Sequence, residues 1–215
     1  MPRRPAWARL YLWAAERLYH EFAWAYDPVS YLVSGGQWDR WRSTVVQHVR
    51  GPRVLELGYG TGALLVQMAR CGLEPWGLER SSQMQRVATR RLRRSGVQVP
   101  RVRADAAHMP FPDGVFDSVV STFPSDYIGR AAVLAEVRRV LRPGPSRLVV
   151  GGLLVEIHHP LLARLPWLTR PGATDQVLER FGERAREAGF RASVIKHRLG
   201  GATVPVFVLE RADGS

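Results

Sequence analysis

One segment constrains the fold of this chain more than any other: residues 53–62, which read Arg-Val-Leu-Glu-Leu-Gly-Tyr-Gly-Thr-Gly. Its first half is rich in apolar residues, as is typical of a short buried strand. Its second half places three glycines at alternate positions, where a backbone can turn sharply or let a ligand approach closely. The segment therefore predicts a strand, a tight turn and the start of a helix, which together form the opening unit of an α/β fold.

From this point onward, segments with strand character alternate with segments with helical spacing. Such alternation indicates βαβ units and a largely parallel sheet. We expect the last two strands to form a hairpin around Gly200 and Gly201, which makes one edge strand antiparallel. The expected strands are 53–57, 74–79, 99–103, 116–121, 147–155, 191–197 and 203–210, and the expected helices are 62–70, 82–94, 130–141 and 175–188.

The first 50 residues have a different character and predict a helical cap ahead of the first strand. Apolar and aromatic residues recur at helical spacing over residues 6–25, and shorter helices are expected at 29–33 and 38–49. The pair Asp27-Pro28 ends the first of these, because a residue that precedes proline disfavours the α region. We therefore divide the chain into a cap, residues 1–50, and an α/β domain, residues 51–215.

Cysteine content and hydropathy limit the class of protein. A single cysteine, Cys71, excludes an internal disulfide and a cysteine-rich metal site, and we expect no metal. No apolar run approaches the roughly 20 residues that a membrane span requires. The N-terminus resembles a secretion signal briefly, but Glu16 and Arg17 interrupt it and no small-residue cleavage site follows. These features favour a cytoplasmic location.

The net charge of +12 comes from an unusual set of basic residues. All of them except Lys196 are arginines, a skew that indicates genome composition rather than a binding surface. The only dense group, residues 90–94, is more typical of a solvated helix face than of an RNA contact. We therefore expect no nucleic-acid partner. The aromatic and basic N-terminus leaves open a peripheral contact with a membrane, and nothing indicates the oligomeric state.

The charge beside the glycines indicates the kind of ligand. Glu56 lies two residues before Gly58, and a carboxylate has the wrong sign for a loop that holds phosphates. It suits a ligand with an ammonium or sulfonium group, and S-adenosylmethionine carries both. One alternative stays open, because Gly58-x-Gly60-x-x-Ala63 also matches the dinucleotide fingerprint of an NAD(P)-dependent oxidoreductase.

Acidic residues also follow the next two expected strands. In open α/β sheets, ligands bind beyond the carboxyl ends of the strands. Glu79 ends the second expected strand, where it can accept hydrogen bonds from both hydroxyls of a ribose. Asp105 follows the third and can accept from an adenine amino group. The end of the fourth strand, near Thr122, should border the methyl-bearing sulfur.

These residues resemble the class I S-adenosylmethionine-dependent methyltransferases, and among them the small bacterial group related to ubiquinone and menaquinone biosynthesis. The similarity covers about residues 26–144. It implies a Rossmann-like, doubly wound sheet of seven strands with the last one antiparallel. It also implies in-line methyl transfer to a small-molecule or lipid-like acceptor. The motifs that carry it are 54–62, 77–81 with Met84, Asp105 with 109–111, Phe116-Asp117 and 140–144.

Carried over position by position, the resemblance implies a set of cofactor-binding residues. The resemblance implies that Glu56 and the glycines face the methionine part of the cofactor, that Tyr26 closes over the cofactor, and that Met84 flanks the adenine. The full set is Tyr26, Glu56, Gly58, Tyr59, Gly60, Gly62, Glu79, Arg80, Met84, Asp105, Ala106 and Thr122.

The acceptor side departs from the commonest pattern of the family. Residues 123–128 replace the histidines that many relatives have after the fourth strand, and His158 and His159 follow the fifth. A general base is useful only if the acceptor is a hydroxyl or an acidic carbon. His158, Asp126 and Tyr127 are the candidates for that role. An RNA methyltransferase and a non-catalytic cofactor-binding protein stay open as further alternatives.

Overall fold

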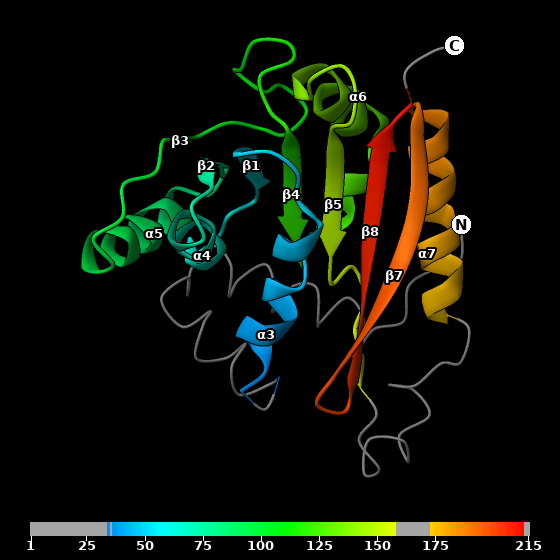
Figure 1. The fold of residues 1–215 in the computed structure, drawn as a ribbon, viewed down its shortest axis with the longest axis horizontal. Helices are drawn as coiled ribbons and strands as arrows, with labels where there is room; N and C mark the ends of the chain where they lie inside the picture. The colour runs from blue at the N-terminus through cyan, green and yellow to red at the C-terminus, as the bar shows by residue number, and fades with distance from the viewer. Residues whose placement is uncertain (1–33, 35, 158–172, 213–215) are drawn as a thin grey trace.

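Helices cover both faces of one sheet in the computed structural model, which describes residues 34, 36–157 and 173–212 (Figure 1). Within those ranges no helix is long and apolar enough to cross a membrane. The elements are α3 (Trp38–Ser43), η2 (Val46–His48), β1 (Arg53–Leu57), α4 (Ala63–Arg70), β2 (Glu74–Leu78), α5 (Ser82–Arg94), β3 (Arg101–Val102), β4 (Ser118–Thr122), η3 (Asp126–Gly129), α6 (Ala131–Val140), β5 (Arg147–Gly151), β6 (Glu156–Ile157), α7 (Ala173–Glu187), β7 (Phe190–Leu199) and β8 (Ala202–Arg211).

The strand order is β3-β2-β1-β4-β5-β8, with β7 paired to the far side of β8. Strands β1 to β5 are all parallel, whereas β8 is antiparallel to both β5 and β7. This confirms the doubly wound sheet of seven strands and its antiparallel hairpin. An eighth strand, the two-residue β6, adds a short pairing to β8. Because β1 lies between β2 and β4, the strand order reverses at β1, which is where such sheets bind ligands.

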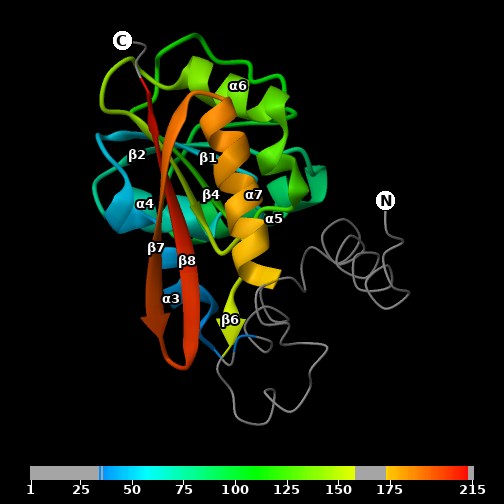
Figure 2. The same cartoon turned by 90° about the vertical axis from the view of Figure 1, so that its right-hand side faces the viewer.

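Alternation along the strands builds a separate apolar core on each face of the sheet. Leu55 and Leu57 of β1 pack with residues of α6 and α7, including Leu134. Val54, the residue before Leu55, points to the other face and packs there with residues of α4 and α5, including Leu64. Figure 2 shows α4 and α7 on opposite sides of the sheet. Two covered faces explain why these strands read as nearly continuous apolar runs.

The expected fifth strand was four residues too long. The strand ends at Gly151, and Gly152 has a φ of 69°, outside the extended region. A Cβ at Gly152 would lie 2.4 Å from a ring carbon of Phe123, so this position needs glycine for space as well. The expected third strand was also too long, because only 101–102 pair with β2.

The segment 38–49 forms a shorter helix than expected, followed by the 3₁₀ turn η2. Gln37, just before α3, donates a hydrogen bond to the Gly200 carbonyl at 2.9 Å, and Ser43 donates to Gln67 of α4 at 3.0 Å. These contacts attach α3 both to α4 and to the hairpin turn. The rest of the expected cap lies outside the described residues, so the division at residue 50 stays a prediction.

Candidate active site

The turn between β1 and α4 has a backbone conformation that favours glycine. Gly58, Gly60 and Gly62 have φ values of 66°, 50° and 74°. Residues with a Cβ pay roughly 1–2 kcal/mol in this region. The two side chains between the glycines, Tyr59 and Thr61, are each only 3% exposed. The turn therefore presents mainly backbone at the carboxyl end of β1.

Gly58 has a further constraint. A Cβ there would lie 2.8 Å from the Tyr127 hydroxyl oxygen, whereas a Cβ at Gly72, which has a φ of 78°, would meet nothing within 4 Å. We expect Gly58→Ala to lower the free energy of unfolding by more than Gly72→Ala does and to weaken ligand binding. Urea denaturation and calorimetric titration measure the two effects. Equal losses of stability in both variants would show that the hydroxyl contact has no influence.

A buried carboxylate at the end of β2 holds this turn in place. Glu79 is 2% exposed. One of its oxygens accepts a hydrogen bond from the Gly60 N–H at 3.0 Å, and the other accepts from the Ser81 N–H at 2.7 Å. Ser81 in turn caps α5, because its hydroxyl accepts from the Met84 N–H at 3.3 Å. Glu79 therefore connects the glycine turn to the start of the next helix.

Glu56, near the end of β1, is a second buried carboxylate. Unlike Glu79, whose two oxygens both accept hydrogen bonds, it has an oxygen that accepts none from the described residues. Glu56 is 2% exposed, and its Oε2 atom has no hydrogen-bond partner among the residues that the structure describes. Burial raises the pKa of Glu56 to about 8, against an opposing effect of Arg42 and with a smaller contribution from Glu79. A buried acceptor without a donor is costly. A cationic group of a ligand would remove that cost.

The adenine side of the predicted site is more exposed. Asp105 accepts a hydrogen bond from the Ala107 N–H at 2.9 Å and pairs with Arg80 at 3.7 Å. The side chains of Ala106 and Met84 are buried in the structure, Met84 completely. Since Leu78 pairs with Val102, the ends of β2 and β3 are neighbours, which brings Glu79 and Asp105 to the same edge. Contact of each of these residues with a ligand stays a prediction.

Tyr127 lies under the glycine turn. Its hydroxyl is 2.9 Å from the Ser121 hydroxyl, and both hydroxyls donate to the Leu57 carbonyl, at 3.2 and 3.0 Å. Burial raises the pKa of Tyr127 above its usual value. A phenol of raised pKa keeps its proton at neutral pH, which argues against a role as general base. The contacts instead suit a residue that ties β1 to β4.

The other acceptor-side candidates are less constrained. The Asp126 side chain is 80% exposed and pairs with Arg130 at 3.7 Å. His158 and Tyr26 lie outside the described residues. Thr122 ends β4, paired with Gly151, and is half-buried. Within the residues that the structure describes, no group of three His, Cys, Asp or Glu side chains is placed to hold a metal ion.

Sequence reasoning missed one feature of this edge. Phe123, directly after β4, has a φ of 49°, a conformation that is uncommon for a bulky residue. Its ring stacks on Trp38 of α3, with centroids 3.9 Å apart and planes inclined by 19°. The one hint in the sequence is the pair of consecutive glycines at 151 and 152. The ring of Phe123 leaves no space for a side chain at Gly152, so the glycine there indicates a close neighbour.

The charges around the turn distinguish between the two kinds of ligand considered. A diphosphate would bring negative charge next to the unpaired oxygen of Glu56, so the turn does not suit a dinucleotide. A ligand with an adenosine at one end and a cationic amino acid at the other complements Glu79 and Glu56 together. S-adenosylmethionine is such a ligand. Together with the strand order, this makes the protein a class I S-adenosylmethionine-dependent methyltransferase.

Comparison with known proteins supports the assignment to the methyltransferases. Residues 54–144 match the model of a methyltransferase domain. The ubiquinone/menaquinone biosynthesis C-methyltransferase UbiE of Cupriavidus pinatubonensis is 34% identical over 179 residues, which are 76% of this chain and 73% of that protein. The demethylmenaquinone methyltransferase of Thermus thermophilus is 37% identical over 139 residues, 62% of this chain and 63% of that one.

Among solved structures, phosphoethanolamine N-methyltransferase 2 of Haemonchus contortus in complex with S-adenosyl-L-methionine superimposes with a TM-score of 0.57. The match covers 83% of this chain and 53% of that one at 16% identity, and so it shows the fold. The sequence relatives show more than the fold. The chain belongs to the UbiE family of methyltransferases.

Proposed function

We propose that this protein transfers the methyl group of S-adenosylmethionine to a ring carbon of a quinol-type acceptor. S-adenosylhomocysteine is the leaving group, and the proton of that ring carbon is released to solvent. The observation that carries the cofactor half of this proposal is the unpaired, buried oxygen of Glu56 beside the glycine turn. The names of the two sequence relatives support the acceptor, since both refer to quinones.

In this proposal the cofactor lies along the carboxyl edge of β1 to β4. Glu56 accepts from the ammonium of the methionine part, and the glycine turn lets that part approach the backbone. Glu79 accepts from the ribose hydroxyls, and Asp105 accepts from the adenine amino group. When bound, S-adenosylmethionine supplies a methyl carbon that its sulfonium already activates. The residues of the chain then need mainly to align the acceptor, which is worth about 7–11 kcal/mol.

The stacked rings of Trp38 and Phe123 support a planar, apolar acceptor. Phe123 directly follows the end of β4, which borders the position expected for the reactive carbon. Backbone strain of the kind seen at Phe123 costs of order 1–3 kcal/mol and is concentrated at functional sites. A flat aromatic acceptor can extend an existing stack at little cost in side-chain entropy, because the rings are already ordered by each other.

The acceptor can be tested with labelled S-adenosylmethionine and a panel of chemically reduced quinols, phenols and phosphoethanolamine. We expect the label on a ring carbon of a naphthoquinol or benzoquinol, located by mass spectrometry. Label that appears on a phenolic oxygen or on an amine instead would refute ring-carbon transfer. A lipid-like tail and a peripheral membrane position are parts of the same proposal, tested by comparing quinols with and without an isoprenoid tail.

The role of the Phe123 ring has its own test. Phe123→Gly removes the ring and relieves the positive φ, whereas Phe123→Leu keeps both the apolar bulk and the strain. We expect the glycine variant to raise KM for the quinol about tenfold while the affinity for S-adenosylhomocysteine stays within twofold of the wild type. An unchanged KM in the glycine variant would exclude the ring from the acceptor site.

A further inference from the structure

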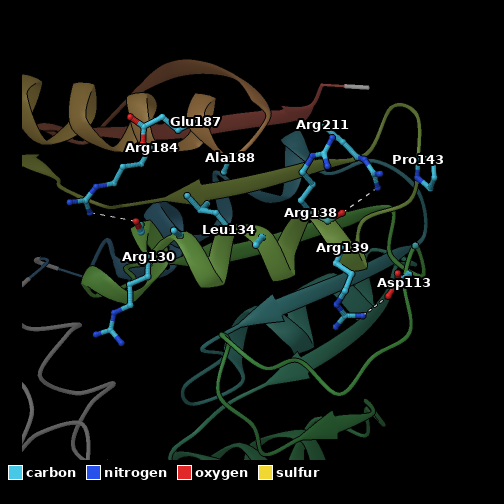
Figure 3. Close-up of a pocket in the computed structure, with 14 residues that line it drawn as sticks. Asp113, Arg130, Leu134, Arg138, Arg139, Pro143, Arg184, Glu187, Ala188 and Arg211 are labelled. Carbon is cyan, nitrogen blue, oxygen red and sulfur yellow. Dashed lines mark hydrogen bonds and ion pairs between the residues drawn. The ribbon is translucent and has the colours of Figure 1, made fainter. Parts of the chain in front are cut away.

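A concave surface lies apart from the glycine turn, between α6 and α7 on the face of the sheet opposite α4. It is an open groove of about 1240 Å³ (Figure 3). Typical sites for small molecules enclose roughly 300–1,000 Å³. The groove therefore suits an occupant larger than a small ligand, and none of the roles proposed for the methyl transfer uses it.

Arginine is the most frequent residue type in the lining of the groove. The arginines are far apart in the sequence but gather around it from three elements: Arg130, Arg138, Arg139, Arg184 and Arg211. Only two carboxylates share the lining, which leaves a formal charge of +3. Arginines that are scattered along the sequence are therefore close together in the folded protein.

Not all of these charges are free to bind a partner. Arg139 is held by Glu136 at 2.6 Å and by Asp113 at 2.7 Å, so its role is structural. Arg138 and Arg184 differ, since among the residues described each donates only to a backbone carbonyl, at 3.3 and 3.5 Å. The Nε atom of Arg138 is buried, and no acceptor in the described part of the chain bonds to it. These two guanidiniums can take an anionic group without breaking an ion pair.

The shape of the groove indicates the class of partner. Arg130 directly precedes α6 and Arg138 lies near the end of the helix, eight residues further on, which is about 12 Å along a helix axis. The small side chains of Ala131 and Ala135 lie between them on an exposed face, where another backbone can approach closely. None of the described residues that line the groove is aromatic, so they offer no stacking surface of the kind that single-stranded nucleic acids use. A concave groove also fits a flat lipid surface poorly.

We propose that the groove between α6 and α7 binds an acidic helical segment of a partner protein. The carboxylates of the segment pair with Arg138 and Arg184, and its small or apolar residues cover Ala131 and Ala135. This is the helix-in-groove mode of recognition, with charge complementarity that sets the orientation. The proposal is independent of the acceptor and of the methyl transfer.

The test uses the full chain and a fluorescent helical peptide with glutamate at every fourth position and alanine and leucine between. We expect Arg138→Glu with Arg184→Glu to weaken binding at least tenfold. The matched control is Arg90→Glu with Arg94→Glu, which makes the same charge change on the exposed face of α5. We expect less than a twofold change there. Because Arg138 is partly buried, Arg184→Glu alone, at an exposed position, provides a second variant that should fold normally.

Three outcomes would overturn the proposal. Equal losses in the groove and control variants would mean that the peptide senses only the net charge. Equal binding of a scrambled peptide of the same composition would mean that no helical face is recognised. Binding of oligouridylate or phosphatidylglycerol vesicles that depends on Arg138 and Arg184, without peptide binding, would assign the groove to another class of partner.

Discussion

Glu79→Ala should weaken the binding of S-adenosylhomocysteine by about ten- to a hundredfold. Hydrogen bonds to a charged group contribute about 1.5–3 kcal/mol, and the carboxylate is proposed to accept both ribose hydroxyls. The variant also leaves the Gly60 N–H without its acceptor, so we expect a loss of stability as well. Calorimetric titration measures the affinity, and thermal unfolding measures the stability.

Two controls separate the ribose contact from the support of the turn. Glu74→Ala removes an exposed carboxylate from the opposite end of the same strand and should leave the affinity unchanged. A ligand that lacks the ribose 2′-hydroxyl should lose less affinity than the normal ligand when Glu79 is replaced, because the two changes remove the same interaction. Strictly additive losses would show that Glu79 acts only through the glycine turn.

The second large effect is a dependence of binding on pH through Glu56. With its pKa raised to about 8, Glu56 is mostly protonated at pH 7 in the free protein. An ammonium placed against it favours the carboxylate, so binding must release a proton. Between pH 6 and 7.5 the affinity for S-adenosylhomocysteine should rise with pH, by up to about tenfold per unit. Titrations in phosphate and in Tris give the number of protons released, which should approach one at pH 7.

Glu56→Gln tests the same carboxylate. We expect it to maintain or raise stability but to lower the affinity for the ligand. The raised pKa means that the native state binds more protons than the unfolded state between about pH 4.5 and 8. Stability therefore falls as pH rises through that window. The amide does not titrate, so the variant should be at least as stable as the wild type at pH 8, yet bind the ligand more weakly and release no proton. Wild-type proton release in this variant would assign the titration to another group.

The sequence was sufficient to predict the features that repeat along the chain. Apolar alternation located the buried strands, and residues 82–94 match α5 at both ends because Ser81 caps its start and Gly96 follows its end. The carboxylates at the ends of the first two strands were predictable for the same reason, since parallel strands bring their carboxyl ends to one edge. The structure adds that both carboxylates are buried at that edge, and their roles toward a ligand stay predictions.

The features that depend on contacts between distant segments could not be predicted. The end of β5 is decided by the ring of Phe123, which belongs to the preceding strand connection. Propensity also gives no reason to expect a positive φ at a phenylalanine. The hydrogen bonds of Tyr127 and the gathering of arginines between α6 and α7 depend in the same way on residues that are remote in the sequence.

The arrangement of Phe123 and Gly152 has a consequence for how such a protein can diversify. The acidic groups that suit the cofactor follow β1, β2 and β3, while the aromatic stack is built from α3 and the segments after β4 and β5. The two sets share no hydrogen bond among those found at Glu56, Glu79 and Asp105. Substitutions in the aromatic half can therefore accumulate without breaking the hydrogen bonds that hold the acidic half in place.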